Sequence, residues 1–326
     1  MIVTVTPNPS LDRTFELDAL VPGEVNRARS VHHDAGGKGI NVSRALARHG
    51  VRTTAVLPAG GRVGDRLVAM LREVGVEAVG VPVVGETRTN VTLVDAAGVT
   101  TKVNAGGPAL TADEVDALVD AVRRLVALRP RAVVAAGSVP GGAAADLYPR
   151  LARIASEGGT PFVLDTSGQT LVDAVAAGGI ALLKPNDDEL AELVGARLQT
   201  VGDVVAAARQ VQAAGVADLL VSLGARGALL VTRDDHWWAG GPPVVPLSTV
   251  GAGDTALAGY LSVDPSTDPS AGTGDGHARR LRTAVAWGRA AVLCPGSAVP
   301  APEDVHEDVV RVLHRPDPSL ALEELR

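Results

Sequence analysis

The sequence predicts an α/β protein built on a doubly wound, mostly parallel sheet flanked by helices, together with a small β-sheet lid. Strand-like and helix-like segments alternate along most of the 326 residues. The strand segments RAVVAAG, PFVLDT and DLLVSLG are short, continuous apolar runs, which is typical of strands covered by helices on both faces. Two β-rich segments interrupt the alternation and predict a separate small sheet.

The elements follow one another in a regular order. A strand at IVTVTP leads to a helix at NVSRALARHG that Gly50 closes, and a strand at RTTAVLP leads to a helix at GDRLVAMLREVG that Gly75 closes. The next helix begins at Thr111, which is spaced from Glu114 as in a capping box. The remaining segments are RAVVAAG, DLYPRLARIASEG, PFVLDT, IALLKPN, DVVAAARQVQAAG and DLLVSLG. The carboxyl ends of these strands are where ligands bind in such folds.

The chain divides into a main domain and a lid. We expect residues 1–12, 31–86 and 104–326 to form the main nucleotide- and sugar-binding domain, and residues 13–30 and 87–103 to form the lid. Residues 87–103 read as two β-rich runs joined by a turn, which suits a lid, a dimer interface, both, or an ordinary edge hairpin. Residues 262–276 are rich in Pro, Ser, Gly and Asp and predict a flexible connection.

Composition excludes several classes of function. The net charge is −7 with acids and bases interspersed, and aromatic residues make up 2%, so we expect no nucleic-acid partner. No apolar run approaches the length of a membrane span, so we expect a soluble protein without a membrane partner. Cys294 is the one cysteine, which excludes a disulfide framework, and no export signal precedes IVTVTP. Together these features predict a cytoplasmic location.

The stretch PLSTVGAGDTALAGYL at 246–261 carries the strongest chemical signal. Gly251, Ala252 and Gly253 have almost no side chain, so their backbone N–H groups can converge on an anion at the start of the following helix; we call this group the anion hole. Asp254 would repel such an anion, and it suits a base that takes a proton from a substrate hydroxyl. The alternative is that Asp254 only caps the helix.

Lysine is rare in this chain. Lys38, Lys102 and Lys184 are the only lysines among 30 basic residues, which indicates sites that need a compact point charge. Lys38 lies in AGGKGIN before a helix, where Asn41 adds an amide. The glycines there do not follow the GxGxxG spacing of a dinucleotide site, so an NAD-dependent oxidoreductase is disfavoured.

Two further motifs follow predicted strands. In KPNDDE, Asn186 and Glu189 are placed either to hold Mg²⁺ largely through water or to cap a helix. In SLGARG, small and polar residues suit nucleotide phosphates or ribose; the candidates are Ser222, Leu223, Gly224, Ala225, Arg226 and Gly227.

Taken in order, AGGKGINVSRAL, KPNDDEL, VSLGARGALL and STVGAGDTALAGYL resemble the PfkB (ribokinase-like) carbohydrate kinases, from about Thr6 to Pro300. TPNPSLDRT, EVNRAR and TRTNVTL resemble the branch that acts on sugar phosphates. The resemblance implies ATP and Mg²⁺ as cofactors, a homodimer formed through the lid, and fructose 1-phosphate as substrate. Tagatose 6-phosphate and fructose 6-phosphate are the alternatives, and a catalytically silent sugar-phosphate-binding regulator is the alternative from another class.

The resemblance also implies roles for individual residues. Asp254 would be the catalytic base beside the anion hole, Lys184 and Asn186 would contact ATP with the SLGARG motif, and Asn186 and Glu189 would serve the metal. The sugar side would use Asp12, Gly37, Asn41 and Ser138, and the substrate phosphate would meet Arg27, Lys38, Arg88 and Lys102. One departure is KVNAGGPAL, where close relatives often carry a Glu-Pro pair after the Asn.

Overall fold

The computed structural model describes residues 1–142, 146–266 and 274–325. Their largest feature is a ten-stranded sheet in the order β14-β13-β12-β11-β10-β9-β8-β1-β4-β5. The strands from β11 to β5 run parallel, whereas β12, β13 and β14 form an antiparallel edge. The strands are β1 (Ile2–Val5), β4 (Thr53–Ala59), β5 (Glu77–Pro82), β8 (Ala132–Ala136), β9 (Phe162–Asp165), β10 (Ile180–Leu183), β11 (Val216–Ser222), β12 (Ala228–Val231), β13 (His236–Gly240) and β14 (Arg311–His314).

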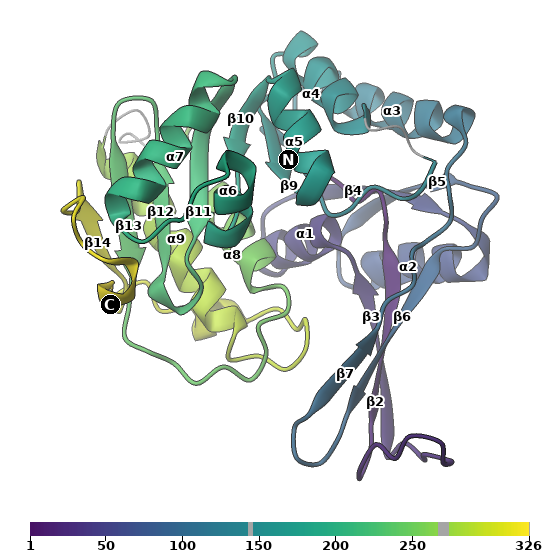
Figure 1. Cartoon of the computed structure of the whole chain (residues 1–326). Helices are drawn as coiled ribbons and strands as arrows, with labels where there is room; N and C mark the ends of the chain where they lie inside the picture. Colours follow the sequence, from purple (N-terminus) through teal and green to yellow (C-terminus); the bar gives the residue numbers. More distant parts are fainter. Residues whose placement is uncertain (143–145, 267–273, 326) are drawn as a thin grey trace.

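Helices cover both faces of this sheet (Figure 1). They are α1 (Lys38–Arg48), α2 (Gly61–Glu73), α3 (Ala112–Val126), α4 (Leu147–Glu157), α5 (Gly168–Ala177), α6 (Asp187–Val194), α7 (Val201–Ala213), α8 (Ala252–Ser262) and α9 (Gly274–Ala291). Buried side chains of α3 to α7 form one core with the sheet, and those of α1, α2, α8 and α9 form cores on the opposite face. The predicted doubly wound α/β fold is confirmed.

Four strands form a second sheet, which projects from the main body in Figure 1. Its order is β3 (Ser30–Gly36), β2 (Ser10–Glu16), β6 (Arg88–Val94) and β7 (Thr100–Val103), and we call it the lid sheet. β2 pairs parallel with β6 and antiparallel with β3. The two parts of the chain that make it are therefore held together by a parallel pairing between strands that lie about 80 residues apart.

The lid sheet is larger than the sequence analysis expected. Strand β3 was assigned to the main domain at 31–86, and β2 begins at Ser10 rather than at residue 13. SVHHDAG lacks the apolar alternation of a half-buried strand because three of its central residues are exposed, so β3 left no pattern to recognise. Of the connection predicted at 262–276, residues 267–273 lie outside the described residues.

The helix termini show how the sequence sets the ends of the elements. The predicted capping box of α3 is confirmed, because the Thr111 side chain accepts from Glu114 N and the Glu114 side chain accepts from Thr111 N. Helix α1 begins at Lys38, earlier than the glycine-rich sequence suggested, because Gly37 adopts a φ of 124° as its N-cap. Lys38 and Asn41 consequently lie in the first turns of α1, at the carboxyl edge of the main sheet.

Candidate active site

The N-terminus of α8 holds the residue predicted as the base. Gly251 is the N-cap of α8 in the left-handed conformation, with φ 76°, and no side chain caps this helix. Asp254 therefore does not act as the cap, which removes the alternative role considered from the sequence. Its side chain is buried, and Oδ2 accepts a hydrogen bond of 2.8 Å from Asn41 Nδ2 of α1.

The surroundings of Asp254 suit a proton acceptor. Burial raises the pKa of Asp254 to about 6, the negative charge of Asp165 adds to this rise, and the Asn41 amide and the two nearby lysines oppose it. A general base works best when its pKa lies near the pH at which the enzyme operates. Asn41 Oδ1 is buried and has no hydrogen-bond partner among the described residues.

A buried carboxylate joins two of the three lysines. Asp165 stands at the end of β9 and Lys184 follows β10, the neighbouring parallel strand, so their side chains meet at one edge of the sheet. Asp165 Oδ1 lies 2.7 Å from Lys38 Nζ, and Oδ2 lies 2.9 Å from Lys184 Nζ. Burial would raise the pKa of Asp165, but the charges of Lys184 and Lys38 outweigh burial and hold that pKa below its ordinary value.

The two lysines present positive charge beside the anion hole. A Cβ placed on Gly253 would meet Lys184 Nζ at 3.3 Å, so the ammonium group lies directly over the glycine. The Lys38 side chain is 37% exposed, whereas that of Lys184 is 7% exposed. Burial would lower the pKa of Lys38, but the charge and hydrogen bond of Asp165, with smaller contributions from Asp254 and Glu189, together raise that pKa above its ordinary value. Lys38 thus lies at the end of the site that contains the base.

Asn186 and Glu189 form the capping box of α6. Asn186 Oδ1 accepts from Glu189 N at 2.7 Å, and Glu189 Oε2 accepts from Asn186 N at 2.9 Å. The helix-cap interpretation is therefore correct, and it is compatible with a metal role because Glu189 Oε1 takes no part in the box. No group of three or more His, Cys, Asp or Glu residues that could hold a metal occurs within the described ranges. A metal ion here would keep most of its ligands as water.

The SLGARG motif forms a tight loop after β11. Leu223 is fully buried, and Gly224–Arg226 form one 3₁₀ turn. Gly227 has φ 88°, and a Cβ on it would meet Ala239 O at 1.9 Å, so only glycine fits. Arg226 Nη2 contacts Asp187 Oδ2 at 2.5 Å, which ties this loop to the start of α6.

The sugar-side candidates gather where the lid sheet meets the main domain. Asp12 Oδ1 accepts bonds from Ser10 Oγ at 2.7 Å and from Asn90 Nδ2 at 2.9 Å, and burial raises the pKa of Asp12. Asn8 Nδ2 donates to Ser138 Oγ at 3.2 Å. Gly37 tolerates no side chain, because a Cβ there would meet Thr6 Cγ2 at 2.5 Å.

The predicted phosphate contacts are spread more widely. Arg88 donates to the backbone carbonyls of Ala105 and Asn8 at 2.8 and 3.0 Å, so its guanidinium links the segments that precede β2 and follow β7. Lys102 is exposed. It pairs with Thr92, which follows Asn90 by two residues on β6, so Lys102 lies on the same face of the lid sheet as Asp12. Arg27 is exposed in the connection between β2 and β3, beyond the end of the lid strands farthest from the main sheet. Arg27 and Lys102 were expected at the substrate phosphate, at the opposite end of the sugar from Asp254, and that assignment stays a prediction.

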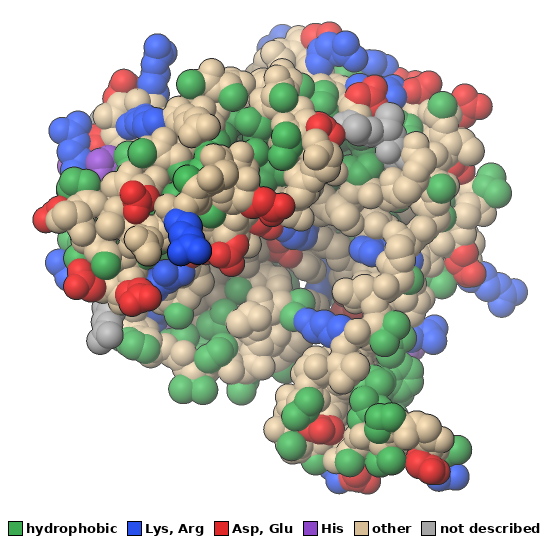
Figure 2. Space-filling view, in the orientation of Figure 1, with side chains coloured by type: hydrophobic (Ala, Val, Ile, Leu, Met, Phe, Trp, Pro, Cys, Tyr) green, Lys and Arg blue, Asp and Glu red, His purple; other side chains and the backbone are tan. Residues whose placement is uncertain are grey.

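The surface is hollowed beside the lid sheet. Figure 2 shows the surface hollowed between the main body and the projecting lid sheet, with Lys or Arg and Asp or Glu side chains around the hollow. Sequence analysis placed Asn8 and Asp165 at strand ends where ligands bind in such folds but assigned them no role, and it missed Asn90. Asp165 had a usable signal, because it ends an apolar strand next to the strand that leads to Lys184. Asn8 and Asn90 hydrogen-bond to Ser138 and Asp12, and only the fold brings these pairs together.

The family described as pfkB family carbohydrate kinase matches residues 5–304. The chain belongs to this family. Its pfkB relatives include the 1-phosphofructokinase of Xanthomonas campestris, 40% identical over 273 residues, which cover 82% of this chain and 85% of the relative. The ATP-dependent 6-phosphofructokinase isozyme 2 of Mycobacterium tuberculosis is 37% identical over 306 residues, covering 93% and 87%.

A solved pfkB structure has the same fold. Phosphofructokinase-2 of Escherichia coli, in complex with potassium, superimposes with a TM-score of 0.83 at 33% identity, covering 93% of this chain and 96% of that one. The resemblance read from the four sequence motifs is therefore confirmed. No helix among the described residues is both long and apolar enough to cross a bilayer.

Proposed function

We propose that this carbohydrate kinase transfers the γ-phosphoryl group of ATP to the free terminal hydroxyl of fructose 1-phosphate and so forms fructose 1,6-bisphosphate. The observation that carries the proposal is the buried Asp254, which combines a pKa near 6 with a neighbouring anion hole and two lysines. Relatives named 1-phosphofructokinase support the choice of sugar.

The proposed reaction needs four contributions from this chain. Asp254 accepts the proton of the hydroxyl, whose oxygen then forms a bond to the γ-phosphorus as the bond to the β-phosphate oxygen breaks and ADP leaves. The backbone N–H groups of Gly251, Ala252 and Gly253 donate to the transferring phosphoryl oxygens. Lys184 and Lys38 add positive charge there, and Asp165 fixes the positions of both ammonium groups.

Metal and nucleotide would approach from the α6 side. Asn186 and Glu189 are the residues that fit a hydrated Mg²⁺, since Glu189 keeps one carboxylate oxygen outside the capping box. Bound there, Mg²⁺ would neutralise charge on the ATP phosphates. The loop 222–227 would contact the nucleotide, as proposed from its sequence. Because ATP and phosphorylated sugars are held inside cells, we also propose that the enzyme acts in the cytoplasm.

The sugar would bind between the main domain and the lid sheet, with Asp12, Gly37, Asn41 and Ser138 at its hydroxyls. Its own phosphate would lie toward Arg88, and Lys102 would approach when the lid sheet closes. Lys38 belongs at the other end of the sugar, beside the transferred group, because it is bonded to Asp165. It therefore does not help to distinguish fructose 1-phosphate from fructose 6-phosphate, since each would present a CH₂OH group to this end of the site.

The alternative substrate is fructose 6-phosphate. A relative named ATP-dependent 6-phosphofructokinase isozyme 2 is as similar to this chain, over as much of its length, as a relative named 1-phosphofructokinase is. Tagatose 6-phosphate remains a third candidate.

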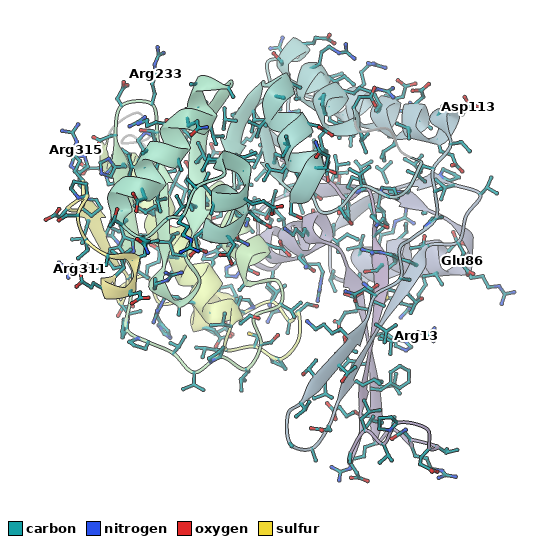
Figure 3. All side chains as sticks on the ribbon, in the orientation of Figure 1. Arg13, Glu86, Asp113, Arg233, Arg311 and Arg315 are labelled. Carbon is teal, nitrogen blue, oxygen red and sulfur yellow. The ribbon has the colours of Figure 1, made fainter. Side chains whose placement is uncertain are left out.

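We further propose a homodimer that forms through the lid sheet. Pairing puts Asp12 and Asn90 on one face of it and Arg13 on the other, where Arg13 points away from the main body in Figure 3. That outer face also carries apolar side chains that are only partly covered, namely Phe15, Val31, Val91, Leu93 and Val103. A second copy would bury them.

A side-by-side assay tests the proposed substrate. Initial rates with ATP and Mg²⁺ are measured for fructose 1-phosphate, fructose 6-phosphate and tagatose 6-phosphate. We expect kcat/KM for fructose 1-phosphate to exceed both others by at least about tenfold, because a misplaced phosphate loses its charge-assisted bonds. A preference for either 6-phosphate would overturn the choice of sugar and leave the role of Asp254 intact.

A further inference from the structure

Arg44 of α1 lies between the base of the lid sheet and the loop that supports the anion hole. Its side chain is only 15% exposed, although it carries a full charge. Nη2 lies 3.6 Å from Asp34 Oδ1, and Nη1 donates to Ala35 O at 3.4 Å; both partners belong to β3 of the lid sheet. Nη1 also donates to Ser297 Oγ at 3.3 Å, across 253 residues of sequence. One guanidinium thus joins two separate parts of the molecule.

Each partner of Arg44 adjoins one half of the candidate site. Asp34 and Ala35 precede Gly36, over which the Asp12 carboxylate lies so closely that a Cβ on Gly36 would meet Asp12 Oδ2 at 2.2 Å. Ser297 lies against the start of α8, where a Cβ on Gly251 would meet Ser297 Cβ at 4.0 Å. A shift of β3 against the main domain would therefore change the contacts of Arg44. Because Arg44 also holds Ser297, the same shift would move Ser297 relative to the anion hole.

We propose that Arg44 is a positioning residue that couples sugar binding under the lid sheet to nucleotide binding at the anion hole. The contacts of 3.3 to 3.6 Å are long for a guanidinium, so they can shorten when the lid sheet moves toward the main domain. If the contacts to β3 and to Ser297 shorten together, the sugar phosphate favours the closed arrangement that also binds the nucleotide well. The nucleotide favours sugar binding by the same free energy, because coupling between two sites is reciprocal. The inference rests on the proposed function, since it needs a sugar phosphate and a nucleotide as the two ligands.

The test measures coupling rather than rate. The dissociation constant of the non-hydrolysable β,γ-methylene analogue of ATP is measured with Mg²⁺, without and with a saturating sugar phosphate, using the sugar that the wild-type enzyme phosphorylates fastest. We expect the sugar to tighten nucleotide binding at least about fivefold in the wild type, as coupled sites commonly do. In Arg44→Met we expect the ratio of the two constants to fall to within twofold of one, with nucleotide affinity in the absence of sugar nearly unchanged.

Matched variants separate coupling from folding. Arg48→Met removes an exposed arginine one turn along α1 and should keep the wild-type ratio. Ser297→Ala and Asp34→Asn each remove one partner and should lower the ratio even if Arg44→Met fails to fold. A wild-type ratio near one, or an unchanged ratio in these two variants, overturns the proposal. Because the sugar is the one the enzyme uses best, a wrong choice of substrate does not affect this result.

Discussion

At Asp254, two influences raise the pKa and three oppose it. Burial and the Asp165 carboxylate disfavour the charged form, whereas the Asn41 amide, Lys184 and Lys38 favour it, and the pKa settles at about 6. A carboxylate with an ordinary pKa would be a weaker proton acceptor, and one with a much higher pKa would be protonated at neutral pH. The residues around Asp254 therefore determine whether its carboxylate can accept a proton at neutral pH.

The first prediction concerns pH. Because the base must be deprotonated, we expect kcat/KM for the sugar to fall with a slope of one as the pH drops below about 6. Lys38→Met removes a positive charge that stabilises the carboxylate, so the pKa of Asp254 should rise and the acid limb should move to higher pH. Arg48→Met serves as the control. An acid limb in Lys38→Met at the wild-type pH would contradict the assigned position of Lys38.

The same variant separates two roles for Lys38. If Lys38 acts beside the transferred phosphoryl group, Lys38→Met should lower kcat by about a hundredfold or more and change the KM for the sugar little, as removal of a charge that acts in the transition state does. A rise in sugar KM at constant kcat would instead assign Lys38 to the substrate phosphate, the role expected from the sequence. Steady-state kinetics at saturating ATP measures both quantities.

At the scale of the elements, the first turns of α1, α6 and α8 hold many of the residues proposed for catalysis. The local sequence predicted many of the helices and strands well, because helix caps and apolar periodicity depend on residues close together in the chain, as in the Thr111 and Glu114 capping box. Strand β3 and the antiparallel edge β12 to β14 were not predicted. β14 pairs with β13 about 75 residues earlier, which no local pattern records, whereas β12 and β13 form hairpins with the strands before them and were missed although their pairing is local. The ion pairs of Asp165 with Lys38 and Lys184 join residues 127 and 19 positions apart, so the sequence shows only that Asp165 ends a strand and not which side chains it meets.

Helix α6 allows the metal role and the capping role of Glu189 to be separated. Gln can replace Glu in a capping box, so Glu189→Gln should keep α6 folded while removing the charge that would hold hydrated Mg²⁺. We expect the Mg²⁺ concentration for half-maximal activity to rise severalfold, with sugar KM within about threefold of the wild type. Asp188→Asn, an exposed neighbour, is the control. Equal Mg²⁺ dependence in both variants would remove Glu189 from the metal site.

At the scale of the whole molecule, the site lies where the lid sheet meets the main domain. If the lid sheet closes over the sugar as proposed, its movement toward the main domain would exclude water from the reacting groups. We expect a saturating sugar phosphate to slow amide hydrogen exchange at residues 88–103 by at least about tenfold, with little change in α7, which packs on the far side of the main sheet. Equal exchange with and without the sugar would show that this sheet is not a lid.

The outer face of the lid sheet predicts the assembly. Val103 is 60% exposed on that face, so Val103→Glu should turn a dimer into a monomer, because the charge would be buried in the interface. Val84→Glu introduces the same charge at a residue that is 96% exposed outside the lid sheet, and it should leave the dimer intact. Light scattering distinguishes these cases. A wild-type monomer, or a Val103→Glu dimer, would rule out this interface.

The most direct test of the central claim follows the phosphorus atoms themselves. Phosphorus NMR of a mixture of enzyme, ATP, Mg²⁺ and fructose 1-phosphate should show one ADP and one fructose 1,6-bisphosphate formed for each ATP consumed. Asp254→Asn should bind the nucleotide as before and form the bisphosphate about a thousandfold more slowly. Formation of inorganic phosphate in place of the bisphosphate, or turnover by Asp254→Asn within tenfold of the wild type, would contradict phosphoryl transfer with Asp254 as the base.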